Sequence, residues 1–404
     1  MSWKKNLFAV TAASFVGFTG FTLVMPFLPL YFEQLGVTDV GEIALWSGLS
    51  LGVTPAVTAL MAPLWGRLAD RFGRKIMVER SLVSFVFVMG AMAFVTEPWQ
   101  VLALRAVQGL FAGYGALTLT MAADSAPPDR MAYAIGVVQT AQRLGPALGP
   151  VIGGVVAQLV GLRRAFFVTS AFYVIAVVLV FLLYKERLPA REQGQEDRGR
   201  VTFRNVLAFE NFLLLMLVVF GLQFVDRSFG PILPLYVAGT GTPGSSVPII
   251  AGLLFSITAG TAAVGNQICA RLLRRHSPRR VIAGASALAS VGTLVYVLAT
   301  HTGQLVIGTI VFGAAIGTAT TATYTAAGTL IPASVRGTGF GLLSTASLAG
   351  LAISPIVSGL LGAVSLRGVF LLDTIALLVV AILVRRLMVT APVPPTSAPA
   401  AEEL

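Results

Sequence analysis

The sequence is poor in the side chains that build disulfides, metal sites and catalytic centres. Its 404 residues include one cysteine, Cys269, which excludes an internal disulfide framework and a paired-cysteine metal site. The two histidines, His276 and His301, are too few for a histidine-rich metal cluster. A nucleophile with a neighbouring base cannot be assembled from so few candidates either. The sequence therefore disfavours an enzyme, and we expect no cofactor and no bound metal.

Charged residues are also scarce. Only 11% of the residues are charged, against about a quarter in soluble proteins, while 56% are hydrophobic and the mean hydropathy is +0.85. These values predict a membrane protein with several spans. The net charge of +11 does not indicate a nucleic-acid partner, because the basic residues fall in short breaks between apolar runs and form no stripe.

Long apolar runs are what the sequence has in excess. A helix needs about 20 apolar residues to span a bilayer, and lipid-exposed backbone must satisfy its own hydrogen bonds within helices. Twelve runs qualify, at residues 7–31, 44–65, 76–95, 99–123, 133–159, 165–184, 208–237, 246–272, 279–300, 303–330, 337–363 and 367–388. The predicted fold is an all-α membrane protein with twelve transmembrane helices in two pseudo-symmetric six-helix bundles. The expected boundaries are a first bundle at 1–184, a cytoplasmic linker at 185–205, a second bundle at 206–388 and a disordered cytoplasmic tail at 389–404.

The basic residues predict the orientation, because short loops rich in Lys and Arg stay in the cytoplasm. If both termini are cytoplasmic, most of the 28 Lys and Arg residues lie on the cytoplasmic side. The exceptions are Arg163, Arg164 and Arg367 outside, and Arg105, Arg143 and Arg227 within spans. We therefore expect a multi-pass protein of the cell (inner) membrane with both ends in the cytoplasm.

The sequence also contains an internal repeat. The segment PFLPLY at 26–31 returns as PILPLY at 231–236. At nearly the same spacing, Gly48 returns as Gly252, Arg67 as Arg271, Gly145 as Gly350, Pro150 as Pro355 and Gly154 as Gly359. The repeat predicts two halves of parallel orientation, an arrangement in which the halves rock about a central site and expose it alternately to each side.

The stretch from Gly66 to Lys75 is a dense group of charges and glycines between two apolar runs. We expect a tight basic turn there, for which Gly73 supplies the conformational freedom. In such a loop, the carboxylate of Asp70 can hydrogen-bond the exposed backbone donors at the N-terminus of a neighbouring helix. The alternative is that these charges only fix the topology. The equivalent second-half loop has Arg274 where Asp70 stands, so any contact of this kind is asymmetric.

Three patterns in the sequence resemble motifs of the major facilitator superfamily. The first resembles motif A, at Gly66, Leu68, Asp70, Arg71, Gly73, Arg74 and Lys75. The second resembles motif B, at Arg105, Gln108 and Gly109. The third resembles motif C of drug-proton antiporters, at Gly136, Gly145, Gly149, Pro150, Gly153 and Gly154. The resemblance covers the whole chain, and MPFLPLYFEQLG at 25–36 is similar to MdtG-type multidrug efflux proteins.

The resemblance implies roles for two of these motifs. In motif A, Asp70 would contact the eleventh span near 336–341 and hold the cytoplasmic side shut, and Arg74 would bridge to Asp124; we call this contact the cytoplasmic latch. The helix that carries motif C would pack at the interface between the halves, and motif C would control leak and direction of transport. Independently of the family, Gly145, Gly149 and Gly153 repeat every four residues and so form a smooth helix face that lets another helix approach closely.

Ionisable residues inside spans are costly and usually face a cavity or a partner. Asp226 is the one carboxylate near the middle of a predicted span, and we expect it to carry protons, with Arg105 and Arg143 as coupling partners. Desolvation favours the neutral form of a carboxyl group, and a neighbouring arginine opposes this. The alternative is a static ion pair between Asp226 and Arg143, Arg105 or Arg227. Asp373, near the outer end of the last span, is expected to be structural.

Side chains from both halves are candidates for a substrate site. Aromatic surfaces tolerate many molecular shapes, and the first and seventh spans are rich in Phe. The expected substrate-binding residues are Phe21, Gln139, Arg143, Gln223, Phe224 and Asp226. The first span lacks the acidic residue that many drug antiporters carry, and three span arginines give the site a positive bias, which is awkward for cationic drugs.

We interpret the sequence as a proton-coupled secondary transporter that exports lipophilic small molecules by alternating access. No P-loop pattern is present, so ATP is not the expected energy source. The expected partners are a small-molecule substrate, protons and the lipid bilayer, with a monomer as the working unit. Two alternatives stay open: an exporter or flippase of an anionic metabolite or lipid, and a membrane sensor or assembly subunit that transports nothing.

Overall fold

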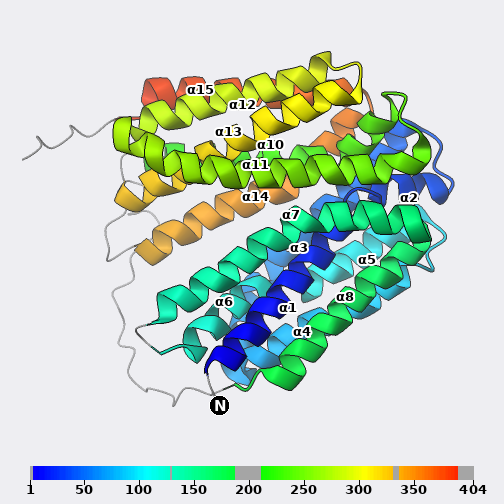
Figure 1. The fold of residues 1–404 in the computed structure, drawn as a ribbon, viewed down its shortest axis with the longest axis vertical. Coiled ribbons are helices and arrows are strands. Elements are labelled where there is room, and N and C mark those ends of the chain that lie inside the picture. Colours follow the sequence, from blue (N-terminus) through cyan, green and yellow to red (C-terminus); the bar gives the residue numbers. More distant parts are fainter. Residues whose placement is uncertain (1–2, 128–129, 187–210, 331–335, 390–404) are drawn as a thin grey trace, which may run out of the picture.

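The computed structural model describes residues 3–127, 130–186, 211–330 and 336–389, apart from the side chains of Pro63, Arg67, Asp70, Ala132 and residues 336–338. Within these ranges the regular structure is helical (Figure 1). The helices of the first half are α1 (Trp3–Leu23), α2 (Leu28–Gln34), α3 (Val40–Phe72), α4 (Arg74–Met92), α5 (Pro98–Phe111), α6 (Tyr114–Ser125), α7 (Met131–Val160) and α8 (Leu162–Leu183). Those of the second half are α10 (Phe212–Ala238), η2 (Gly244–Ser246), α11 (Val247–Arg275), α12 (Pro278–Leu298), α13 (Thr302–Leu330), α14 (Arg336–Gly362) and α15 (Leu366–Leu387).

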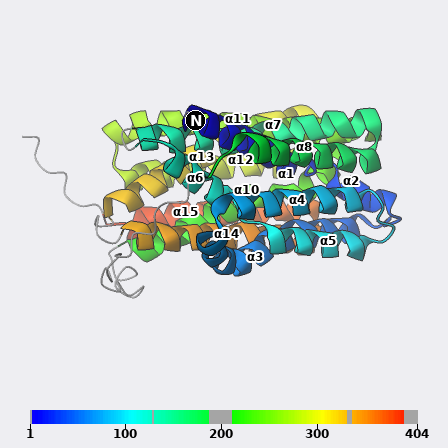
Figure 2. The same cartoon turned by 90° about the horizontal axis from the view of Figure 1, so that it is seen from below.

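The helices form two bundles that follow the two halves of the sequence. In the first bundle α1 packs on α7 and α8, α3 on α5, and α4 on α8. In the second, α12 packs on α13 and α15, α11 on α13, and α10 on α14. The bundles lie side by side in Figure 1, and the same layers of roughly parallel helices are seen from below in Figure 2. The prediction of an all-α fold with two six-helix bundles is confirmed.

Eleven helical segments in the described ranges are long and apolar enough to span a membrane. The predicted span at 76–95 is α4, which is not among them because Arg74, Lys75, Glu79 and Arg80 lie in its first two turns. Most of the predicted linker at 185–205 and of the tail at 389–404 lies outside the described residues.

Two predicted spans are each divided into two helices, which corrects the sequence-based boundaries. The run 7–31 forms α1 and α2, with a turn between them that contains Pro26, whose ring cannot supply a backbone donor. The run 99–123 forms α5 and α6, which are separated at Gly113, where φ is +117°. Hydropathy detects the length of an apolar run but not a break within it.

The basic stretch 66–75 turns at Gly73, as expected, but it is helical on both sides, so the turn is shorter than predicted. Helix α3 continues to Phe72, α4 begins at Arg74, and the turn is the single residue Gly73, with φ of +94°. This φ is strained for any residue with a Cβ. The carboxylate of Glu186, which follows α8, accepts hydrogen bonds from the backbone nitrogens of Arg74 (2.6 Å) and Lys75 (3.4 Å). An acid beyond the first bundle's last helix therefore caps the start of α4.

We expect the substitution Glu186→Ala to lower the free energy of unfolding by about 1 kcal/mol, because α4 loses the side chain that satisfies its first backbone donors. Thermal unfolding of the purified protein in detergent measures this effect. Glu33→Ala is the matched control, since Glu33 is exposed on α2. Equal unfolding temperatures for the two variants would contradict the capping role.

The glycine face of α7 packs on α1, within the first bundle. A Cβ at Gly145 would meet the backbone of Phe15 and Thr19, one at Gly149 would overlap Thr22, and one at Gly153 would overlap the carbonyl oxygen of Leu23. These glycines therefore allow backbone contact between two helices of one bundle. Gly136, the first glycine of the motif C pattern, has open space around its Cβ position.

The bundles meet through a second set of small residues at the end where α2 lies, which we call the α2 end; the opposite end, with the Gly73 turn, is the turn end. At Gly48 of α3 a Cβ would overlap the carbonyl oxygen of Pro355 in α14, and at Gly252 of α11 one would overlap that of Pro150 in α7. These two contacts are repeats of each other, because Gly48 pairs with Gly252 and Pro150 with Pro355 in the internal repeat. In Figure 1 the bundles meet at the α2 end and diverge toward the turn end.

Candidate functional site between the bundles

A small cavity of about 50 Å³ lies where the two bundles meet, and we call it the junction cavity. Its lining comes from α1, α3, α5, α10, α14 and the turn after α1, and consists of Phe21, Met25, Leu51, Thr54, Pro55, Arg105, Arg227, Gly230, Leu351 and Pro355. It combines an apolar wall with two guanidinium groups, one from each bundle. Walls from both bundles are what a site exposed by rocking of the halves requires.

Arg105 is buried at the first-bundle side of this cavity, with 2% of its surface exposed. Its Nη1 donates a hydrogen bond to Oε1 of Gln108 (2.8 Å), while its Nε and Nη2 have no partner among the described residues. The Thr54 hydroxyl donates to the backbone oxygen of Arg105 (2.9 Å), and Gly109 lies against the Thr54 backbone. The motif B residues therefore hold a buried cation with two free donors next to the cavity. Such a group can bind a carboxylate or another anion.

Asp226 and Arg227 lie together on α10, beside the junction cavity. Oδ2 of Asp226 is 3.3 Å from Nε of Arg227, close enough for electrostatic attraction, although this nitrogen makes no hydrogen bond. The side chains are partly exposed, at 27% and 35%. Gly230, one helical turn farther along the same face, lies against Leu51 and Met25 of the first bundle. Asp226 therefore faces the first bundle.

The other predicted substrate residues lie around this junction. Phe21 lines the cavity. Gln139 and Arg143 are exposed on α7. They precede Pro150 and Gly154, which contact α11, by about three helical turns each, so they lie on the wall that faces the second bundle. On α10, Gln223 donates from Nε2 to the Ser347 hydroxyl of α14 (3.0 Å), and the backbone oxygen of Phe224 accepts a hydrogen bond from Ser354.

Asp373 is a buried carboxylate whose environment the sequence analysis did not foresee. It has 0% exposure on α15, and its Oδ2 accepts a hydrogen bond from the Ser228 hydroxyl of α10 (2.6 Å). Its Oδ1 has no partner among the described residues. The sequence did show a polar residue, Ser228, directly after Arg227 in an apolar span. Spacing alone does not show that α15 packs against this part of α10.

We expect Asp373→Asn to unfold at nearly the wild-type temperature. Asp373→Ala should lower the free energy of unfolding by about 1–3 kcal/mol. Asparagine keeps an acceptor on α15 for the Ser228 hydroxyl, whereas alanine removes this buried hydrogen bond between α10 and α15 and leaves the hydroxyl only the backbone oxygen of Val225 (2.9 Å) as an acceptor. Thermal unfolding in detergent compares the two variants directly. If both were equally destabilised, the negative charge of Asp373 and not its hydrogen bond would be what the fold needs.

At the turn end, the motif A region contains one of the two predicted contacts, and the other involves side chains that the structure does not describe. Arg74 at the start of α4 forms an ion pair with Asp124 near the end of α6. Nζ of Lys75 donates to the backbone oxygens of Phe181 (3.0 Å) and Tyr184 (2.8 Å) at the end of α8. Gly66 and Arg71 lie in the last turns of α3 and are exposed. The predicted contact between Asp70 and residues 336–341 involves side chains outside the described part of the chain.

Comparison with known families gives a consistent result. The model of the family described as Major Facilitator Superfamily matches residues 10–250 and 215–404. A multi-drug resistance efflux pump PmrA homolog of Lactococcus lactis is 32% identical over 282 residues, which cover 70% of this chain and 69% of the relative. The multidrug resistance protein MdtG of Serratia proteamaculans is 34% identical over 282 residues, with the same coverage.

Two solved structures share the fold at low sequence identity. A bacterial homolog of the human lysosomal transporter Spinster, in an inward-facing and occupied conformation, superimposes with a TM-score of 0.77 at 17% identity, covering 94% of this chain and 95% of that one. The human organic anion transporter MFSD10 (TETRAN) has a TM-score of 0.62 at 19% identity, covering 93% of this chain and all of that one. The family match along the chain, two relatives above 30% identity and this shared helical fold together show that the chain belongs to the major facilitator superfamily, whose members are membrane transporters.

Proposed function

We propose that this chain is a proton-coupled secondary transporter that exports lipophilic small molecules by alternating access. The observation that carries the proposal is the junction cavity, because α1, α3 and α5 of the first bundle and α10 and α14 of the second meet there. Its apolar wall, with Phe21 and Leu351, suits lipophilic substrates of varied shape. The names of the efflux-pump relatives support the same substrate class.

The basic residues support a cytoplasmic position for the turn end, since Arg71, Arg74, Lys75, Arg274 and Arg275 all lie there. The conformation described above, joined at the α2 end, would then be open to the cytoplasm. Substrate would enter the space between the bundles from that side. In the state closed to the cytoplasm, Asp70 would hold the cytoplasmic side shut as part of the cytoplasmic latch. The other latch residues would position the end of α3 that carries Asp70; they are Gly66, Arg71, Gly73, Arg74 and Asp124.

Asp226 is the proposed proton carrier. It is partly exposed, it faces the first bundle, and it lies beside Arg227 of the cavity lining. Protonation from the outside would neutralise Asp226, weaken its attraction to Arg227 and favour the return to the inward-facing state. Arg105 and Arg143 are the proposed coupling partners, because Arg105 lines the junction cavity and Arg143 is exposed on the face of α7 toward the second bundle.

A second candidate is an exporter of an anionic metabolite or lipid, favoured by two guanidinium groups in one small cavity. Proteoliposomes containing the purified protein separate the two candidates. A lipophilic cationic dye is supplied, proton movement is followed with an internal pH indicator, and cationic dyes and acidic lipids are added as competitors. Dye-driven proton movement that cationic dyes inhibit supports drug export. Competition by anions alone, together with loss of binding in Arg143→Ala, would instead support the anion exporter.

A further inference from the structure

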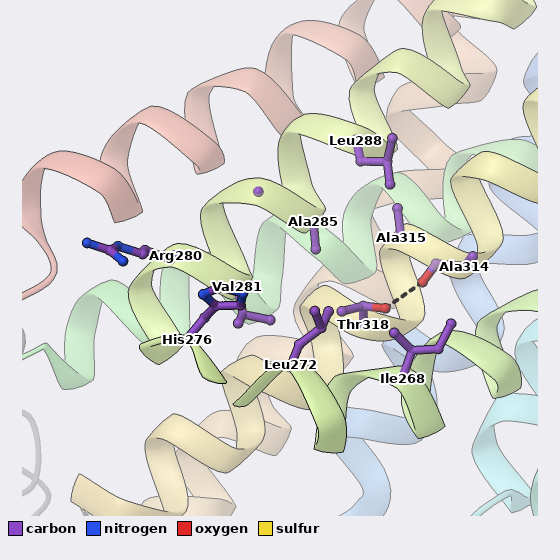
Figure 3. Close-up of a pocket in the computed structure, with 11 residues that line it drawn as sticks. Ile268, Leu272, His276, Arg280, Val281, Ala285, Leu288, Ala314, Ala315 and Thr318 are labelled. Carbon is purple, nitrogen blue, oxygen red and sulfur yellow. Dashed lines mark hydrogen bonds between the residues drawn. The ribbon is translucent and has the colours of Figure 1, made fainter. Parts of the chain in front are cut away.

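A groove of about 460 Å³ lies in the second bundle between α11 and α12, with α13 as its floor (Figure 3). Ile268 and Leu288 form its rims and are exposed at 41% and 52%. Helices α11 and α12 barely touch each other, whereas both pack extensively on α13. The groove is therefore a gap between two helices that opens at the surface of the second bundle, and it shares no lining residue with the junction cavity.

The first bundle shows the same place filled by its own side chains. The guanidinium carbon of Arg80 lies 3.3 Å from the ring centre of Trp65 and 5.9 Å from that of Phe111. Nη2 of Arg80 donates to the backbone oxygen of Phe111 (3.0 Å), and the Trp65 indole donates to that of Leu110 (2.7 Å). These side chains close the space between α3 and α4 over the end of α5.

The second bundle has small residues at the equivalent positions. The spacing that relates Arg67 to Arg271 places Gly284 at the position of Arg80 and Ala315 at that of Phe111. Both Gly284 and Ala315 line the groove, and no heavy atom outside its own helix lies within 4 Å of a Cβ built on Gly284. Packed protein interiors and interfaces leave few apolar voids of this size. The repeat therefore indicates that something other than this bundle's side chains fills the groove.

Charge separates the two ends of the groove. In Figure 3, His276 and Arg280 lie at one end, and the apolar side chains of Leu288 and Ile268 lie at the other. Arg280 is exposed, and its side chain makes no hydrogen bond or ion pair with the described residues. The acidic residues described in the second bundle are Asp226 and Asp373, both on other helices, so no carboxylate at this end neutralises it.

We propose that this groove binds one molecule of an anionic phospholipid, with an acyl chain between α11 and α12 and the phosphate at His276 and Arg280. The groove runs about 12 Å from Arg280 to Leu288 along α12, a length that suits part of an acyl chain. A basic side chain near the headgroup favours an anionic lipid over a zwitterionic one by about fivefold. The proposal concerns a fixed lipid and does not depend on which substrate the junction cavity transports.

Native mass spectrometry of the full chain, released from detergent that contains phosphatidylglycerol or phosphatidylcholine, tests the proposal. We expect one retained phosphatidylglycerol per chain, with at least about fivefold lower retention of phosphatidylcholine. Gly284→Trp should fill the groove and abolish retention, because its Cβ meets open space and the fold can accept it. Ile382→Trp, on the exposed face of α15, is the matched control and should retain the lipid.

A second pair of variants separates the charge from the groove. Arg280→Gln should lower phosphatidylglycerol retention about fivefold and leave phosphatidylcholine unchanged, while Arg274→Gln, exposed but outside the groove lining, should have a smaller effect. Equal retention of both lipids by the wild type would overturn the charge assignment. Full retention in Gly284→Trp would overturn the groove as the site, as would retention of a lipophilic dye in preference to phosphatidylglycerol.

Discussion

The substitution Gly48→Val should nearly abolish transport while leaving the protein folded. Gly48 lies where α3 meets α14 at the α2 end, and a Cβ there would overlap the carbonyl oxygen of Pro355 and crowd Gly359. A larger side chain keeps the bundles apart at this end. The conformation that is closed at the α2 end, which is the one described here, is therefore destabilised relative to a conformation that is open there. Overpacking of this kind typically costs about 1–3 kcal/mol, which corresponds to a loss of about 5- to 150-fold in the population of the closed form.

Substrate uptake into proteoliposomes and thermal unfolding in detergent should be measured on the same preparations. Gly260→Val is the matched control, because its Cβ position on α11 meets no neighbouring atom. Gly153→Val is the contrasting variant: it would overlap the Leu23 carbonyl within one bundle, so it should lower the unfolding temperature itself. Wild-type transport rates in Gly48→Val would mean that the α2 end does not have to close during the cycle.

The substitution Asp226→Asn should eliminate substrate-driven proton movement and leave substrate binding nearly intact. Asparagine has almost the same shape as aspartate but cannot exchange a proton, and the apolar part of the junction cavity is unchanged. We expect coupled proton flux to fall to the level of empty liposomes. Exchange of substrate for substrate across the membrane should continue, because it needs no net protonation.

An internal pH indicator and labelled substrate give both readouts from one preparation. Asp226→Glu should restore part of the proton flux, since it retains a carboxyl group at the same position on α10. Glu33→Gln, which alters an exposed carboxyl group on α2, controls for a general loss of acidity. If substrate-driven proton flux is unchanged in Asp226→Asn, Asp226 takes no part in proton transfer and only pairs with Arg227.

The sequence predicted the features that depend on spacing and composition. The repeat of Gly145, Gly149 and Gly153 indicated a smooth helix face, and that face is in backbone contact with α1. The choice of α1 as the partner could not be predicted, because periodicity defines a face but not what lies against it. The resemblance also implied the pairing of Arg74 with Asp124, which the structure contains.

Contacts between distant segments were beyond the sequence. Glu186 lies at the start of a stretch that resembled a solvated linker, yet its carboxylate caps α4. Asp373 was expected to be structural because it is near the end of its span, but its partner, Ser228 of α10, could not be predicted. In both cases the decisive partner is more than 100 residues away in the chain, and no local pattern reports such a partner.

The two contacts at the α2 end, Gly48 with Pro355 and Gly252 with Pro150, place backbone against backbone. At these two contacts no interdigitated side chain has to change rotamer when the surfaces separate, and among the described residues no hydrogen bond crosses between the bundles there. The free-energy barrier to separating the bundles at these contacts should therefore be small, because little side-chain repacking is needed. Because the two contacts are copies within one repeat, a rotation that opens one also opens the other. At these two contacts the bundles can therefore separate as rigid bodies, with little rearrangement of side chains.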